Sequence, residues 1–199
     1  MPGVRCLLFM IILKAAFIIL LISNVACGKA NRSAANAQLP QLNSTAQKAY
    51  PNAKIQANQL NDAVLAADYG KAADLTYPKL IQLIGGRAKY LGVLKSGMNE
   101  MQSERFRIIS TVSDDPTEVI ELGSHVYAVL PTTMKIKVAE GVLVGQSSLI
   151  GVSNDRGEHW TFVDAGGGFN HEQLRTLFPD VAERLKIPEQ KRPVLQRAP

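Results

Sequence analysis

Apolar and polar positions divide the chain into two parts with different periods. Between residues 60 and 102, apolar side chains recur three or four positions apart, as in helices that pack by one face. Gly70, Pro78 and the pair Gly85–Gly86 interrupt this pattern, because glycine often ends a helix and proline often begins one. The pattern predicts a first helix with Leu60, Ala63, Val64 and Ala67 on its apolar side, a short second one through Leu75, a third over 78–84, and a longer one over 87–102 with Tyr90, Leu91, Leu94 and Met98 on one face.

From residue 107 onward the pattern alternates with a period of two, as in strands with one buried face. Strands are predicted over residues 107–112, 118–122, 124–138, 142–153 and 159–164. The turn residues 154–157 separate the last two strands as in an antiparallel hairpin. After three consecutive glycines, a closing helix is predicted near residues 172–178. Helices followed by long antiparallel strands predict an α+β fold, in which N-terminal helices pack on one face of a curved antiparallel sheet in a cone-like shape.

The first 27 residues fit neither period. Arg5 precedes an apolar run over residues 6–22, broken only by Lys14, and small residues then lead to Cys27. A charged start, an apolar middle and a small-residue exit are typical of a secretory signal. The sequence therefore predicts export.

Cys27 leaves three forms of that signal open. The pair Ala26–Cys27 resembles a bacterial lipobox, although Asn24 stands where that motif has leucine, and the resemblance implies that Cys27 is lipidated. Plain secretion, with cleavage after Ala26 or Ala30, is the second interpretation. An uncleaved membrane anchor over residues 6–27 is the third, since that run is about long enough to span a bilayer. All three place residues 28–199 outside the cytosol, either at the cell envelope or in a periplasmic or secreted form.

Composition then divides the rest of the chain. Residues 28–54 are rich in Ala, Asn, Gln and Ser and are predicted to form a flexible linker. Residues 55–186 are of a length that suits one compact α+β domain. Residues 187–199 carry three prolines and several charges, and we expect a disordered tail there.

Cysteine content and charge exclude several kinds of chemistry. The chain has two cysteines, Cys6 and Cys27, and both lie in the apolar N-terminal region, so the exported part has neither disulfides nor a thiol nucleophile. Arg5 and Lys14 are the only charged residues before Cys27, and the remaining net charge of +3 does not indicate nucleic-acid binding. The three histidines lie on separate predicted elements, so no metal site is predicted, and no motif indicates a cofactor.

Two segments resemble a known superfamily. Residues 66–78, from Ala66 to Pro78, resemble the opening of the nuclear transport factor 2-like fold, which is shared with ketosteroid isomerase-like and polyketide cyclase-like proteins, and residues 149–164 resemble its final hairpin. The resemblance implies a cone that encloses a pocket between helices and a bent sheet. It implies no particular activity, because that superfamily includes enzymes, binding modules and scaffolds. The catalytic residues of ketosteroid isomerases find no counterpart here that can be aligned.

Six residues are candidates for the wall of such a pocket, although each ring also suits an ordinary core. Asp164 shares its strand parity with two of the rings, so it could serve as an acid or base in the pocket, or as a turn residue before the glycines. The candidates are Tyr77, Tyr90, Tyr127, Trp160, Phe162 and Asp164.

Two classes of function remain open from the sequence. The first is a non-catalytic module, tethered to the membrane through its N-terminal segment, which binds a small apolar ligand or a partner protein of the cell envelope. The second is a small pocket enzyme of the isomerase or cyclase type, with a carboxylate base. No feature of the sequence indicates an oligomeric state.

Overall fold

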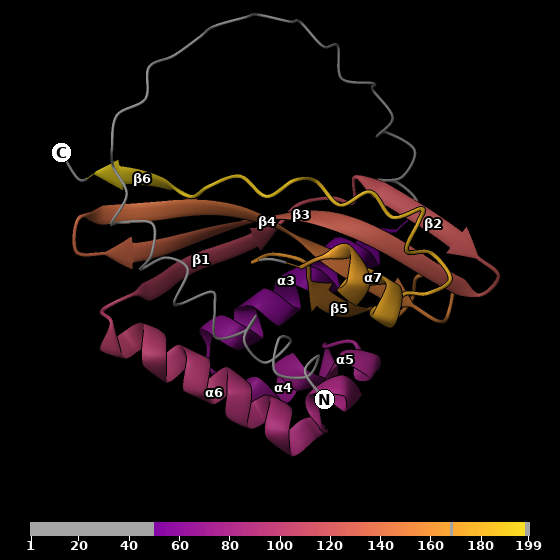
Figure 1. Ribbon diagram of the computed structural model, residues 1–199, viewed down its shortest axis with the longest axis horizontal. Helices are drawn as coiled ribbons and strands as arrows, with labels where there is room; N and C mark the ends of the chain where they lie inside the picture. The colour runs from indigo at the N-terminus through magenta and orange to yellow at the C-terminus, as the bar shows by residue number, and fades with distance from the viewer. Residues whose placement is uncertain (1–49, 168, 198–199) are drawn as a thin grey trace, which may run out of the picture.

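A computed structural model describes residues 50–167 and 169–197 (Figure 1). The predictions for the N-terminal signal, for Cys27 and for linker residues 28–49 lie outside these residues. Within the described ranges, no helix is both long enough and apolar enough to cross a membrane. The described fold is α+β, with a long, curved antiparallel sheet and helices on both of its faces.

The described chain begins with four helices: α3 (Pro51–Leu65), α4 (Tyr69–Asp74), α5 (Pro78–Ile84) and α6 (Arg87–Ser103). Pro51 and Pro78 stand in the first turns of α3 and α5, where a missing backbone N–H costs nothing. The Asp68 carboxylate accepts the N–H of Lys71 and so caps α4. Gly85 ends α5 in the left-handed conformation, with a φ of 108°.

A central hairpin organises the sheet. Strands β3 (His125–Val138) and β4 (Gly141–Ser153) pair along their whole length, from Val126 opposite Ser153 to Val138 opposite Gly141. One end of this hairpin is flanked by β2 (Glu118–Leu122) and β5 (Thr161–Asp164), and the other end by β1 (Arg107–Ser113) and β6 (Val194–Arg197). We call these the β2–β5 end and the β1–β6 end of the sheet (Figure 1).

The two faces of the sheet differ in what covers them. We call the face toward α3 and α6 the inner face; Val126, Leu130 and Ile136 of β3 point to it. The opposite, outer face carries Tyr127 and Val129, which pack against Leu177 of helix α7 (His171–Leu177) and the residues that follow it. Helix α7 therefore follows β5 in sequence and covers the other face of the sheet, so the expected arrangement with helices on a single face is incomplete.

The structure differs from the sequence predictions at both ends of the described chain. Helix α3 begins at Pro51, so the last residues of the expected linker belong to the fold. At the C-terminus, Val194–Arg197 form strand β6 on β4 within the expected disordered tail. Unpaired backbone groups at the edge of β4 explain this pairing, because a sheet edge accepts an added strand even from a segment without apolar periodicity.

Strand β5 is shorter than predicted and begins at Thr161 instead of His159. The backbone N–H of His159 donates to the Asp155 carboxylate, and the N–H of Trp160 donates to the side-chain oxygen of Gln56. These donors are therefore used outside the sheet. A pattern of apolar positions does not reveal whether a backbone N–H donates to a side-chain oxygen or to a neighbouring strand.

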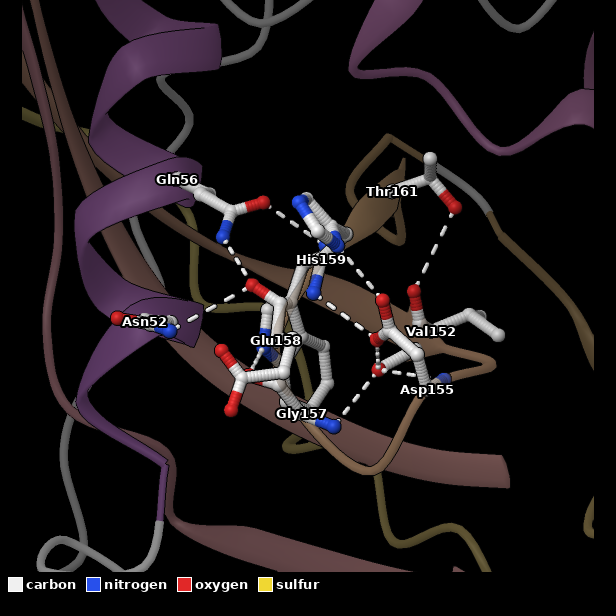
Figure 2. Close-up of polar contacts among 10 residues, drawn as sticks. Asn52, Gln56, Val152, Asp155, Gly157, Glu158, His159 and Thr161 are labelled. Atoms are coloured by element: carbon white, nitrogen blue, oxygen red, sulfur yellow. Dashed lines mark hydrogen bonds and ion pairs between the residues drawn. The ribbon is translucent and has the colours of Figure 1, made fainter. Parts of the chain in front are cut away.

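Figure 2 shows the hydrogen bonds between α3 and the turn that connects β4 to β5. Gln56 accepts from Trp160 N at 2.8 Å and donates to the Glu158 carbonyl at 2.7 Å, and Asn52 also donates to that carbonyl. Within the turn, the Trp160 indole N–H donates to the Gly157 carbonyl at 2.8 Å. The indole is thus satisfied as well as buried, at 1% exposure.

Candidate functional site

A cavity of about 230 Å³ lies between the helices and the inner face of the sheet. Helix α6 forms one wall with Tyr90, Leu94, Met98 and Met101, and helix α3 adds Leu60, Asn61 and Val64. Strands β1, β3, β4 and β5 form the opposite wall. The cavity therefore lies between helices and the curved sheet.

Three methionines give this cavity its chemical character. Met98, Met101 and Met134 all line it, and the chain has no other methionine after residue 10. Methionine is unbranched and polarisable, so it adapts to ligands of irregular shape. The cavity wall is therefore apolar and adaptable in shape.

A few polar groups interrupt the apolar wall, and they occur in bonded pairs. The Thr76 hydroxyl donates to the Ala72 carbonyl, so it accepts from the Tyr90 phenol at 2.8 Å. Thr132 lies 2.9 Å from the Ser113 hydroxyl, which accepts from the Asn61 amide at 3.0 Å. These contacts leave the side chains pre-organised around the cavity.

Asp164 lines the cavity at the end of β5. Its carboxylate accepts the N–H of Gly166 at 2.7 Å and lies 3.5 Å from the Ser147 hydroxyl. A bond from a side-chain oxygen to the backbone N–H two residues on is the mark of an Asx turn. The side chain therefore has the turn role considered for Asp164, and it also lines the cavity.

Tyr90 is the titratable phenol of this wall. Burial raises its pKa, the hydrogen bond with Thr76 opposes that shift, and the charge of Asp164 raises the pKa further. The phenol therefore stays protonated at neutral pH. It can donate a hydrogen bond, but it is poorly suited to act as a base.

The six candidate residues divide into three groups. Tyr90, Phe162 and Asp164 line the cavity. Tyr77 and Tyr127 instead contact Phe178 beyond α7, Tyr77 by stacking at 5.4 Å between ring centroids and Tyr127 by an edge at 6.3 Å. Trp160 packs in the core with Ala53, Ala57 and Leu60 of α3, whereas its strand parity with Phe162 predicts packing against the long helix over 87–102.

Sequence reasoning missed most of the cavity wall, including the methionines. The apolar period places Met98 on one face of the predicted long helix, but nothing in that pattern brings it together with Met134, which lies in the strand predicted over 124–138. The signal that could have found them is compositional, since every methionine after residue 10 belongs to the cavity.

Asp115, Glu118 and Glu121 form separate contacts with other parts of the chain. Asp115 pairs with Lys54 of α3 at 2.9 Å, and Glu118 accepts the backbone N–H of Lys186 at 2.6 Å. Glu121 accepts the Tyr50 phenol, and burial together with this carboxylate raises the pKa of Tyr50 to about 12. Among the described residues, no group of three or more His, Cys, Asp or Glu side chains could hold a metal ion.

The fold and the cavity together define a class: an α+β protein that encloses an apolar cavity between helices and one face of an antiparallel sheet. Comparisons with models of protein families, with curated proteins and with solved structures find no match for this chain. Its function is therefore argued from the cavity itself.

Proposed function

We propose that this chain is a non-catalytic binding module, exported and tethered to the membrane, which holds a small apolar ligand in the cavity between helix α6 and the sheet. The observation that carries the proposal is an apolar cavity of about 230 Å³ lined by Met98, Met101 and Met134. Export and lipidation at Cys27 rest on the N-terminal sequence pattern. Membership in the nuclear transport factor 2-like superfamily is part of the proposal, and the order of helices before a long bent hairpin supports it.

Size and polarity narrow the class of ligand. A cavity of about 150 Å³ can hold benzene, so this larger cavity suits a compact molecule of one or two fused rings. Asp164 and Ser147 lie together on an otherwise mostly apolar wall. The preferred ligand is therefore mostly apolar, with at most one polar group that faces these two side chains.

The alternative is an isomerase- or cyclase-type enzyme that uses Asp164 as its base. The Asp164 carboxylate accepts a hydrogen bond from the Gly166 N–H within a turn. The Tyr90 phenol has a raised pKa and is hydrogen-bonded to the Thr76 hydroxyl. These are features of a wall that positions a ligand. The binding module is the better-supported proposal, because a phenol with a raised pKa and a carboxylate that caps a turn suit ligand positioning more than proton abstraction.

Titration calorimetry with indole as the probe tests the proposal. We expect one indole to bind per chain with a negative heat-capacity change, because binding buries apolar surface. Leu94→Trp should fill the cavity and abolish the signal, whereas Lys95→Trp, at the next and exposed position of α6, should leave it unchanged. Met134→Phe should fill the same cavity from the side of the sheet, and it serves as a second blocking variant if Leu94→Trp fails to fold. Equal binding by the wild type and both blocking variants would overturn the proposal.

A further inference from the structure

The outer face of the sheet is covered at one end and uncovered at the other. At the β2–β5 end, Ile150, Val152 and Val163 pack beneath Leu174 and Phe178. At the β1–β6 end, Lys135, Lys137 and Gln146 of the same face are exposed. The strands continue, but the helical cover of the outer face ends.

The register assigns the residues of this uncovered face. Arg107 lies opposite Lys137, which lies opposite Val142, and Val142 lies opposite Gln196. The next row holds Ser110, Lys135, Val144 and Val194, and the third holds Val112, Thr133 and Gln146. We call these three rows the basic face.

The charge of the basic face is one-sided. Its rows contain three cations and no carboxylate; Glu140 stands outside them, in the turn between β3 and β4. None of the three cations takes part in an ion pair among the described residues. Arg107 and Lys137 are direct cross-strand neighbours, a like-charge pairing that weakens a sheet. A partner that carries negative charge would relieve this repulsion.

The uncharged residues of the face indicate what kind of anionic partner fits. Val112 is 50% exposed and Val194 63% exposed, so apolar side chains stand among the cations. No aromatic residue occurs in the rows, so the face offers no ring on which a base of a nucleic acid could stack. Cations mixed with exposed aliphatic side chains suit a lipid surface, where the charges meet anionic headgroups and the aliphatic groups enter the interface.

We propose that the basic face docks the domain on a membrane surface rich in anionic lipid. This inference is independent of the cavity, because the basic face and the cavity lie on opposite faces of the sheet. It also accords with the apolar N-terminal run, which by itself would hold the chain close to a bilayer. Docking would fix the orientation of the domain, with the inner face of the sheet, helices α3 and α6 and the cavity turned away from the lipid.

Amine labelling of the full chain tests this orientation. The chain is mixed with vesicles of phosphatidylcholine alone, or with vesicles that also contain phosphatidylglycerol, and each lysine is followed by mass spectrometry. In the anionic vesicles we expect the labelling of Lys135 and Lys137 to fall at least threefold, because each cation near an anionic surface contributes a several-fold gain in binding. Lys89 and Lys95, exposed on α6, serve as internal controls and should label equally in both. At 1 M salt the protection should disappear, because screening then shortens to about 3 Å.

A matched pair of variants assigns the effect to the basic face. Arg107→Gln should weaken the protection of Lys135 and Lys137, whereas Lys95→Gln removes the same charge from α6 and should not. Unprotected lysines in anionic vesicles would overturn the proposal. Protection that also occurs with phosphatidylcholine alone and grows with protein concentration would overturn it too, since a second copy of the chain would then cover the face.

Discussion

The two ends of the central hairpin are built from the same pair of strands but are packed in opposite ways. At the β2–β5 end, Trp160 fills the inner face and Phe178 with its neighbours covers the outer face. At the β1–β6 end, Met134 on the inner face lines the cavity, which also extends to Phe162 and Asp164 of β5, and the outer face is uncovered and basic. We infer that the first end supplies stability and that the second is available for binding.

The largest expected effect comes from removing the ring at the centre of the stable end. Trp160→Ala deletes a side chain that is 1% exposed and hydrogen-bonded to Gly157. Such truncations cost about 3–5 kcal/mol of the free energy of unfolding. Chemical denaturation of the wild type and the variant measures the difference. A variant as stable as the wild type would show that the stable end does not depend on this ring.

A smaller but still large loss is expected at the turn beneath Tyr50. Gly157 has a φ of 96°, and a Cβ at this position would overlap the Tyr50 ring. Gly157→Ala should therefore cost about 2 kcal/mol, from the left-handed backbone and the steric overlap together. The matched control is Gly92→Ala, an exposed helical position with no atom near the added Cβ, which should stabilise α6 by about 0.5–1 kcal/mol. Equal effects of the two substitutions on the melting temperature would contradict this account.

The wall of the cavity should tolerate truncation better than the stable end. Met134 lines the cavity and is only partly buried, so Met134→Ala should cost only about 1 kcal/mol, below the 2–5 kcal/mol typical of a fully packed methionine. The same variant should weaken indole binding, because it removes an apolar contact from the wall. Denaturation and calorimetry on one sample measure both effects. A stability loss equal to that of Trp160→Ala would show that the two ends are packed alike.

The smallest expected effect concerns the Asp155 carboxylate, which should change the melting temperature only at acid pH. The backbone N–H of His159, followed by its ring and the Ser153 hydroxyl, holds the pKa of Asp155 below the ordinary value of 3.8. A carboxyl group with a lowered folded-state pKa stabilises the fold above its unfolded pKa and loses this contribution as the pH falls through the folded value. The melting temperature of the wild type should therefore fall more steeply below pH 4 than that of Asp155→Asn. Parallel curves for the two proteins would contradict the assignment.

The comparison also shows how far sequence patterns reach. Periodicity predicted helix Pro78–Ile84 and strand Glu118–Leu122 to the residue, because Pro78 and the turn residues mark their bounds. It placed Tyr90 and Phe162 on apolar faces but could not separate cavity from core, since both require the same apolar positions. Strand β6 was missed because its exposed residues have no apolar period and are held by backbone pairing with β4. The basic face depends on register between strands far apart in sequence, which a one-dimensional pattern does not contain.

Native mass spectrometry of the purified full chain tests the central claim most directly. The account predicts that the wild type carries one small apolar molecule per chain, retained from the host or supplied as indole. It also predicts that Leu94→Trp loses this molecule while Lys95→Trp keeps it. A wild type that binds nothing, or a Leu94→Trp variant that binds as the wild type does, would contradict a ligand site in the cavity.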